Sequence, residues 1–274
     1  MHKKALWTYI FIIFGKANLL GVSEKVAYVE TNLKLPTRHN PYLHEIVIDT
    51  LKSQQPGKVL DIPSGPGYLL RDLKAFGHDG VAAEIDERLH CFDDLTYCKV
   101  DMTSRFDFPD ASFDYVVSIE GIEHIENHFS FLREVRRVLR PGGVLILTTP
   151  NVLSLESRWS FFTSGFHHLA AKPIPLDTEN IYFEHINPIP LHQLYFACEK
   201  SGLRIKELKT HRYRKGSQFL YYLFYPLIRW AIYSACFRKE KDPKRREMNK
   251  SLYRFLSSKE NLLGSHTIIV AEAV

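Results

Sequence analysis

The chain has few cysteines and lacks the long uncharged hydrophobic run that a membrane-spanning helix requires. Its 274 residues include four cysteines, Cys91, Cys98, Cys198 and Cys236, whose spacing matches neither a zinc site nor a disulfide framework. Cysteines of this kind suit a reducing compartment. The sequence therefore predicts a cytoplasmic protein, with membrane association at the inner face left open.

An apolar segment opens the chain. Residues 5–15 are largely apolar and aromatic, and they follow the basic start Met1-His2-Lys3-Lys4. About 11 residues are too few to cross a bilayer, and no small-residue cleavage site of a secretory signal follows. We therefore predict that residues 1–39 form an N-terminal docking segment ahead of a single domain over residues 40–274.

Residues 58–67, Lys-Val-Leu-Asp-Ile-Pro-Ser-Gly-Pro-Gly, combine an apolar strand, an acid and a tight glycine loop. The strand is expected over residues 59–62, and a helix begins at Tyr68. A strand, a glycine turn and a helix N-terminus together form a cradle for a nucleotide-like ligand. Gly65 and Gly67 let the backbone approach such a ligand where a Cβ atom would collide.

Acidic residues stand at the ends of the next strands. Glu84 lies near the end of the second expected strand, where a carboxylate can accept both ribose hydroxyls of an adenosine ligand. Asp101 follows the third strand, where an acid can bind the adenine amino group while Met102 packs on the ring, and Glu120 follows the fourth. The expected strands are residues 59–62, 81–86, 97–100, 113–119, 144–149, 203–208 and 266–271, and the expected helices are 41–53, 68–76, 129–139 and 190–201.

This order of motifs resembles the class I S-adenosylmethionine (SAM) dependent methyltransferases of the type 11 and type 23 groups. The segments at residues 108–114 and 138–143, the second containing Arg-Pro-Gly-Gly, resemble two further motifs of that family. The resemblance covers about residues 40–208 and the last strand. It implies an α/β fold with a Rossmann-like, seven-stranded, mostly parallel sheet, an antiparallel last strand and helices on both faces.

The resemblance also implies methyltransferase activity with SAM as the cofactor. The cofactor-binding residues that it implies are Asp61, Pro63, Ser64, Gly65, Gly67, Tyr68, Glu84, Ile85, Asp101, Met102, Ile119 and Glu120. Pro63 departs from the family, which usually has a glycine at this place. Proline fixes φ at about −65° and removes a backbone donor, but Gly65 and Gly67 remain, so we interpret Pro63 as a tolerated variant.

The segment after the fourth strand carries the groups expected to react. Glu120, Glu123 and His124 fall within one helical turn, where residues three or four apart share a face. With His185 they would form a site for Mg²⁺ or Mn²⁺, similar to that of small-RNA 2′-O-methyltransferases and ubiquinone-pathway O-methyltransferases. Alternatively, His124 acts as a general base with Glu123 beside it, because an unperturbed imidazole titrates near neutrality. The sequence leaves both roles open.

Positive charge is concentrated in the C-terminal third. The formal net charge is +5, yet residues 204–254 alone hold 15 basic and 4 acidic residues. This stretch overlaps a predicted insertion at residues 210–262, between the last two strands, which is centred on an aromatic run over residues 219–237. The run is long enough to span a bilayer, but Pro226 and Arg229 interrupt it and the chain must return to the same sheet.

We therefore expect residues 212–246 to lie on an anionic membrane surface, with aromatic side chains at the acyl boundary and basic side chains on the headgroups. A helical cap packed on the core, with solvated charges, is the alternative. A second insertion, residues 151–189, is rich in aromatic residues and predicts a lid at the edge of the sheet.

The predicted function is SAM-dependent O-methylation of a small, membrane-associated acceptor linked to a lipid or glycan. A base beside the methyl donor favours oxygen, because only a hydroxyl acceptor must be deprotonated. An RNA 2′-O-methyltransferase is one alternative, and the contiguous aromatic residues make nucleic acid the less favoured partner. A non-catalytic SAM-binding partner protein is the other, and the acids Asp61, Glu84 and Asp101 argue against it.

Overall fold

The computed structural model describes residues 40–168, 173–174 and 184–274. The expected docking segment at residues 1–39 lies outside the described residues, as do residues 169–172 and 175–183 of the expected lid at residues 151–189. Both therefore stay predictions.

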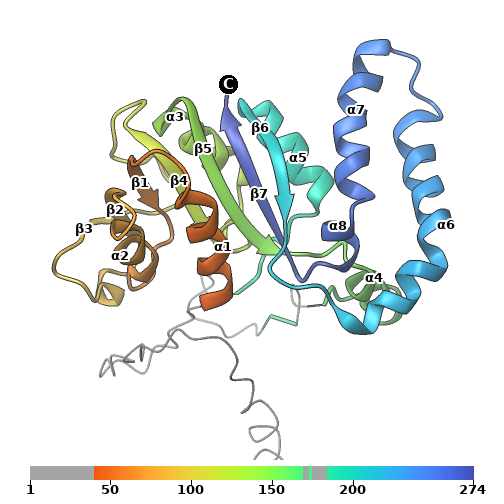
Figure 1. The fold of residues 1–274 in the computed structure, drawn as a ribbon, viewed down its shortest axis with the longest axis horizontal. Helices are drawn as coiled ribbons and strands as arrows, with labels where there is room; N and C mark the ends of the chain where they lie inside the picture. Colours follow the sequence, from red (N-terminus) through yellow and green to blue (C-terminus); the bar gives the residue numbers. More distant parts are fainter. Residues whose placement is uncertain (1–39, 169–172, 175–183) are drawn as a thin grey trace, which may run out of the picture. The chain divides into compact units, whose positions relative to one another are not determined.

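Seven strands form one sheet in the order β3-β2-β1-β4-β5-β7-β6 (Figure 1). Strands β1 to β5 pair in parallel, and β7 pairs antiparallel with both β5 and β6. The predicted mostly parallel sheet with an antiparallel last strand is confirmed. The strands are β1 Lys58–Asp61, β2 Asp79–Glu84, β3 Thr96–Lys99, β4 Phe113–Ile119, β5 Leu139–Pro150, β6 Leu203–Lys209 and β7 His266–Ala273.

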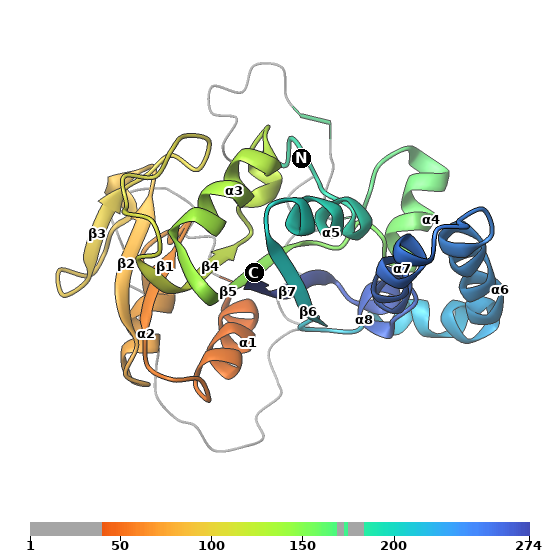
Figure 2. The same cartoon turned by 90° about the horizontal axis from the view of Figure 1, so that it is seen from above.

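Helices cover both faces of the sheet, as predicted (Figure 2). Successive strand residues point to opposite faces, so Val59 packs in the apolar layer with α1 and α2, while Leu60 packs in the layer with α3 and α5. A fully buried aliphatic side chain stabilises a fold by about 1.5–3 kcal/mol. The two layers together therefore hold the strands, and with them the sheet edge that carries the site, in place. The helices are α1 Pro41–Leu51, α2 Tyr68–Lys74, α3 His128–Val138, α4 Leu155–Ser164, α5 Leu191–Lys200, α6 Gln218–Phe237, α7 Pro243–Leu256 and α8 Lys259–Leu263, with short 3₁₀ helices η1 Glu87–Leu89, η2 Ile122–His124 and η4 Lys215–Ser217.

Most element boundaries differ from the sequence prediction by one or two residues, and two of the differences have a clear local cause. The second strand ends at Glu84 rather than at residue 86, because the carboxylate of Asp86 accepts a bond from Arg88 N (3.1 Å) and begins η1 instead. The fifth strand begins at Leu139 rather than at residue 144, because Leu139 pairs with Phe113 across the sheet before the glycine-containing turn.

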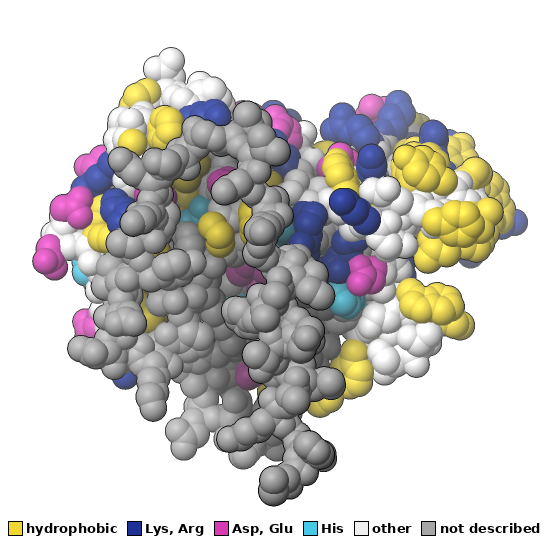
Figure 3. All heavy atoms as spheres, turned by 60° about the horizontal axis from the view of Figure 1, so that its bottom comes forward, with side chains coloured by type: hydrophobic (Ala, Val, Ile, Leu, Met, Phe, Trp, Pro, Cys, Tyr) yellow, Lys and Arg dark blue, Asp and Glu magenta, His cyan; other side chains and the backbone are white. Residues whose placement is uncertain are grey.

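The insertion between β6 and β7 folds as helices. Helices α6 and α7 run side by side as a hairpin, and α7 packs toward α5 and α8 (Figure 1). Within residues 40–168, 173–174 and 184–274, no helix combines the length and apolarity needed to cross a membrane. Figure 3 shows hydrophobic side chains gathered on the part of the surface that α6 forms, with lysine and arginine beside them.

Candidate active site

The glycine loop connects β1 to α2 at the carboxyl edge of the sheet. Ser64 N donates to Ala83 O (2.9 Å) and Gly67 N donates to Ser64 O (3.1 Å), which holds the loop against β2. Gly65 and Gly67 have φ values of 51° and 90°, in the region that glycine adopts without strain. A Cβ atom built on Gly65 would meet no atom within 4 Å in the described structure, so the loop borders open space that a ligand can fill.

Glu84, at the end of β2, is fastened to this loop. Its Oε2 accepts from Gly65 N (2.9 Å) and its Oε1 accepts from Ile85 N (2.8 Å). Burial raises the pKa of Glu84, and the backbone donors lower it in part. A carboxylate has about four acceptor positions, so each oxygen keeps capacity for a ribose hydroxyl. The geometry suits the predicted role of Glu84.

Asp61, the last residue of β1, is a buried acid with an unsatisfied oxygen. Its side chain is almost fully buried, and Oδ2 has no hydrogen-bond partner among the described residues. Burial raises the pKa of Asp61, and the nearby charge of Glu84 raises it further. An unpaired buried carboxyl group is costly, and a cationic ligand would offset that cost. SAM carries a sulfonium and an ammonium group, so these residues fit it.

Pro63 is accommodated by a glycine elsewhere in the chain. A Cβ atom on Gly121 would lie 2.5 Å from Pro63 Cδ and 3.1 Å from Met102 Cε. Only a glycine leaves room for this contact, which brings the end of β4 and Met102 against the loop. Asp101, next to Met102, uses Oδ1 to accept from Thr103 N (2.8 Å) and Thr103 Oγ1 (2.7 Å), so its adenine contact stays a prediction.

Tyr68 begins α2 directly after the loop, and its ring packs edge-on against Phe92 with centroids 5.1 Å apart. Ile119, the last residue of β4, is half-buried. Both side chains adjoin the predicted cofactor site in the chain, and their cofactor contacts stay predictions.

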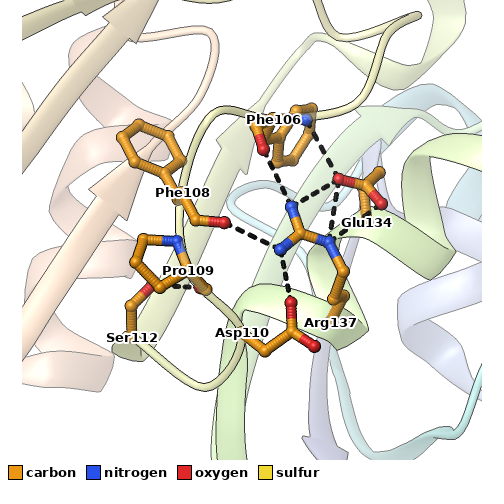
Figure 4. Close-up of polar contacts among 7 residues, drawn as sticks. All are labelled: Phe106, Phe108, Pro109, Asp110, Ser112, Glu134 and Arg137. Atoms are coloured by element: carbon orange, nitrogen blue, oxygen red, sulfur yellow. Dashed lines mark hydrogen bonds and ion pairs between the residues drawn. The ribbon is translucent and has the colours of Figure 1, made fainter.

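The motif at residues 108–114 is tied to α3 by Arg137 (Figure 4). The guanidinium of Arg137 on α3 donates to Phe106 O (2.9 Å), Phe108 O (2.7 Å) and Asp110 Oδ1 (2.7 Å), and it also pairs with Glu134 (2.7 Å). These bonds tie the segment before β4 to α3. They also lower the pKa of Glu134 and raise that of Arg137.

Glu120 follows β4 in a left-handed backbone conformation, with φ at 49°. Such strain in a non-glycine residue gathers at functional sites. Thr148 Oγ1 accepts from Glu120 N (3.1 Å) and donates to Glu120 Oε1 (2.9 Å), while Glu120 Oε2 lies 3.4 Å from His266 Nε2. Glu120 is thus held by β5 and β7.

Two histidines in this neighbourhood were missed by the sequence analysis. The rings of His211 and His266 lie 4.8 Å apart, and Ser265 Oγ contacts both. Burial is the main cause that lowers the pKa of His211 to about 4, and the charge of the neighbouring His266 is the second. They could have been found only from the register of β7 against β5, which pairs His266 with Pro150 at the carboxyl end of β5.

Glu123 and His124 of η2 lie close to His185, which stands near the end of the expected lid. One ligand atom from each lies within 4.8 Å of the others, and the two imidazole rings meet edge to face with 75° between their planes. His124 Nδ1 lies 2.9 Å from Glu184 O. A carbonyl oxygen only accepts, so Nδ1 carries the proton and Nε2 is the acceptor atom of the neutral ring.

Glu123 is fully buried. Its Oε2 accepts from Thr149 Oγ1 (3.1 Å), and Oε1 has no partner in the described part of the chain. Burial raises the pKa of Glu123, and the charge of Glu120 adds to the effect. Two imidazoles and a carboxyl group form a donor set that suits a divalent cation. Three of the four predicted ligands thus come together, while Glu120 is engaged by Thr148 and His266; the metal site stays a prediction.

If Glu123, His124 and His185 hold a metal, EDTA is expected to abolish methyl transfer and Mg²⁺ or Mn²⁺ to restore it. His185→Ala should raise the metal concentration needed for half-maximal activity, while calorimetry shows unchanged SAM affinity. His168→Ala is the matched control, because His168 contacts Glu156 on α4 instead. Full activity in EDTA removes the metal hypothesis.

The raised pKa of Glu123 predicts a stabilising substitution. The folded chain binds this proton more tightly than the unfolded chain, so the contribution of Glu123 to stability is complete below the unfolded pKa, about 4.3, and is lost as pH rises through the folded value. Glu123→Gln should therefore increase the Tm near neutral pH, by about 2–4 °C per kcal/mol, and the gain should shrink toward acid pH.

Glu134→Gln provides the opposite control for this measurement. Arg137 lowers the pKa of Glu134, so the stability that this group contributes is present above the unfolded pKa and lost in acid. Its replacement should lower the Tm near neutral pH. An equal or lower Tm for Glu123→Gln at neutral pH contradicts the buried-acid account.

Comparisons with known proteins agree with this geometry. A family model described as a methyltransferase domain matches residues 37–208. A probable SAM-dependent methyltransferase of Mycolicibacterium smegmatis is 34% identical over 129 residues, covering 45% of this chain and 50% of that protein. The human mitochondrial ubiquinone biosynthesis O-methyltransferase is 24% identical over 221 residues, covering 74% of this chain and 58% of that protein. The chain thus spans about half the length of the curated relatives that it matches.

A solved structure supports the fold alone. The crystal structure of a SAM-dependent methyltransferase from Archaeoglobus fulgidus superposes with a TM-score of 0.51 at 18% identity, covering 84% of this chain and 94% of that one. Since the family model covers more than half of the chain, the protein belongs to the SAM-dependent methyltransferase family.

Proposed function

We propose that this protein transfers the methyl group of SAM to a hydroxyl oxygen of a small acceptor that is linked to a lipid or glycan and lies at a membrane. The observation that carries the proposal is the position of His124. It lies with buried Glu123 at the end of β4, three residues after Gly121, which packs against Pro63 of the cofactor loop.

The chemistry follows from that arrangement. SAM supplies an activated methyl group on a sulfonium. His124 Nε2 accepts the proton of the acceptor hydroxyl as the oxygen–carbon bond forms and the electron pair of the carbon–sulfur bond returns to sulfur. The loop, with Asp61 and Glu84, supplies in-line positioning, which accounts for most of the rate in such a displacement. The name of the human O-methyltransferase relative supports oxygen as the acceptor atom.

The test is transfer of tritiated methyl groups from SAM into a fractionated cell extract. Label is expected in the lipid or glycolipid fraction, in a product that resists alkaline hydrolysis as an ether does and an ester does not. Label in RNA would favour the 2′-O-methyltransferase alternative. Bound SAM without label in any fraction would favour a non-catalytic partner protein.

A further inference from the structure

Helix α6 exposes large apolar side chains to an extent unusual for a helix on a folded domain. Phe219 is 73% exposed, Tyr222 71% and Trp230 63%. A surface helix normally turns its apolar stripe to the core, and contiguous exposed apolar area marks an interaction surface. The exposed large side chains of α6 are Phe219, Leu220, Tyr222, Leu223, Phe224, Leu227, Trp230 and Tyr233.

The opposite side of α6 is fixed to α7. Arg229 Nε donates to Tyr253 OH (3.0 Å), Asn249 Nδ2 donates to Cys236 O (2.7 Å), and Phe237 packs against Tyr253 with centroids 5.7 Å apart. These contacts hold the hairpin together. They also place the guanidinium of Arg229, the charge inside the apolar run, on the α7 side of the helix.

Helix α4 extends the apolar surface. Trp159 and Phe162 of α4 are 63% and 80% exposed, and with Phe224 and Leu227 of α6 they line a groove of about 440 Å³ between the two helices. That volume lies in the range of sites that bind small apolar ligands. Helix α4 follows β5 after a short loop, so the groove begins near the sheet edge that carries the reacting groups.

Basic side chains border the apolar face at both ends of α6. Residues 212–246 hold ten lysines and arginines and two acids. Arg212 and Lys215 precede the helix and are exposed, and the turn into α7 adds further exposed basic residues (Figure 3). Those between α6 and the first turn of α7 are Arg238, Lys239, Lys241, Lys244, Arg245 and Arg246.

Not every charge in this region is available to a ligand. Arg214 pairs with Glu156 on α4 (2.7 Å), and Arg246 donates to Phe237 O (3.0 Å) and Glu240 O (2.9 Å), so it caps the end of α6. These two arginines hold the hairpin in place. The exposed lysines and arginines around them supply the charge that a partner meets.

We propose that α6 and α4 form a membrane-docking face that lies on an anionic lipid bilayer. Apolar side chains enter the acyl boundary, basic side chains contact lipid phosphates, and the groove receives a hydrocarbon chain. Charge complementarity favours lipid over a second copy of this chain, which would present the same positive charge. The contiguous apolar side chains distinguish the face from a phosphate-tracking RNA surface. The proposal adds to the proposed function the surface by which the protein contacts the membrane. It does not depend on the acceptor's identity.

Vesicle flotation of the full chain tests the proposal. The protein should float with vesicles of phosphatidylcholine and phosphatidylglycerol at low salt, less at high salt through screening, and poorly with phosphatidylcholine alone. Replacing Arg238, Lys239, Lys241 and Lys244 by Gln should weaken partitioning at low salt by about a thousandfold. Replacing Phe219, Leu223 and Trp230 by Gln should weaken it at every salt concentration. The matched control replaces four exposed basic residues outside the hairpin, Lys99, Arg105, Arg133 and Lys200, by Gln.

The outcomes separate this inference from the proposed function. The docking proposal is supported if both hairpin variants lose vesicle binding but keep their SAM affinity, and if the control variant keeps its vesicle binding. It is overturned if wild-type protein ignores anionic vesicles at low salt or if the control loses binding equally. An apolar variant that only dissociates a dimer, or RNA binding in place of vesicle binding, also overturns it. Methyl-transfer activity is scored separately, in detergent solution, so its absence bears on the function alone.

Discussion

Gly65→Val is expected to weaken SAM binding by about a hundredfold while the domain stays folded. The Cβ of residue 65 would enter open space at the cofactor loop, where a ligand's close approach leaves no room for methyl groups. Overpacking of this kind costs about 1–3 kcal/mol. The domain should stay folded, because the described residues place no atom within 4 Å of that Cβ and the remaining cost is that of holding an L residue at positive φ. Calorimetric titration with SAM measures the effect.

Gly142→Val is the matched control. Gly142 also has positive φ, 77°, and no described atom within 4 Å of its Cβ, but it lies near the amino end of β5, at the opposite sheet edge. A left-handed conformation costs an L residue roughly 1–2 kcal/mol, so both variants should lose similar stability. Only Gly65→Val should lose SAM. Equal SAM affinity in wild type and both variants would falsify the assignment of the loop.

The local structure of the loop between β1 and α2 was predictable because its determinants are local. Strand β1, the glycines and α2 occupy one short stretch, and the carboxylate of Glu84 reaches Gly65 N as the strand-end position implies. The sheet order followed from the family resemblance. The boundaries of β2 and β5 were less predictable, since a 3₁₀ helix cap at Asp86 and the pairing of Leu139 with Phe113 decide them.

The acceptor side depends on contacts between distant parts of the chain. His266 reaches Glu120 only because β7 pairs with β5 in one register, which hydrophobic alternation does not specify to the residue. The aromatic run with basic ends was visible in the sequence. The sequence did not show which face of this run is exposed, since that face is set by the contact of Arg229 with Tyr253. Arg246 reads as a surface charge, yet it caps α6.

His124→Asn is expected to lower kcat by about 10²- to 10⁴-fold, the range for loss of a general base, with SAM affinity unchanged. Asparagine keeps a donor near the position of Nδ1 and so retains the bond to Glu184 O, but it has no basic nitrogen in place of Nε2. The wild-type rate should fall in acid as imidazoles gain a proton, and the variant should lack this limb of the pH profile.

His266→Gln separates the two histidine neighbourhoods at the end of β4. His266 contacts Glu120 through Nε2, whereas His124 and His185 group with Glu123. If His124 is the base, His266→Gln should retain the acid limb of the profile and lose far less activity. If instead His266→Gln abolishes turnover while His124→Asn preserves it, proton transfer runs through Glu120 and His266. Activity that vanishes in EDTA for wild type and that excess Mg²⁺ partly restores in His124→Asn would identify His124 as a metal ligand, because a lost ligand weakens metal binding whereas added metal does not replace a lost base.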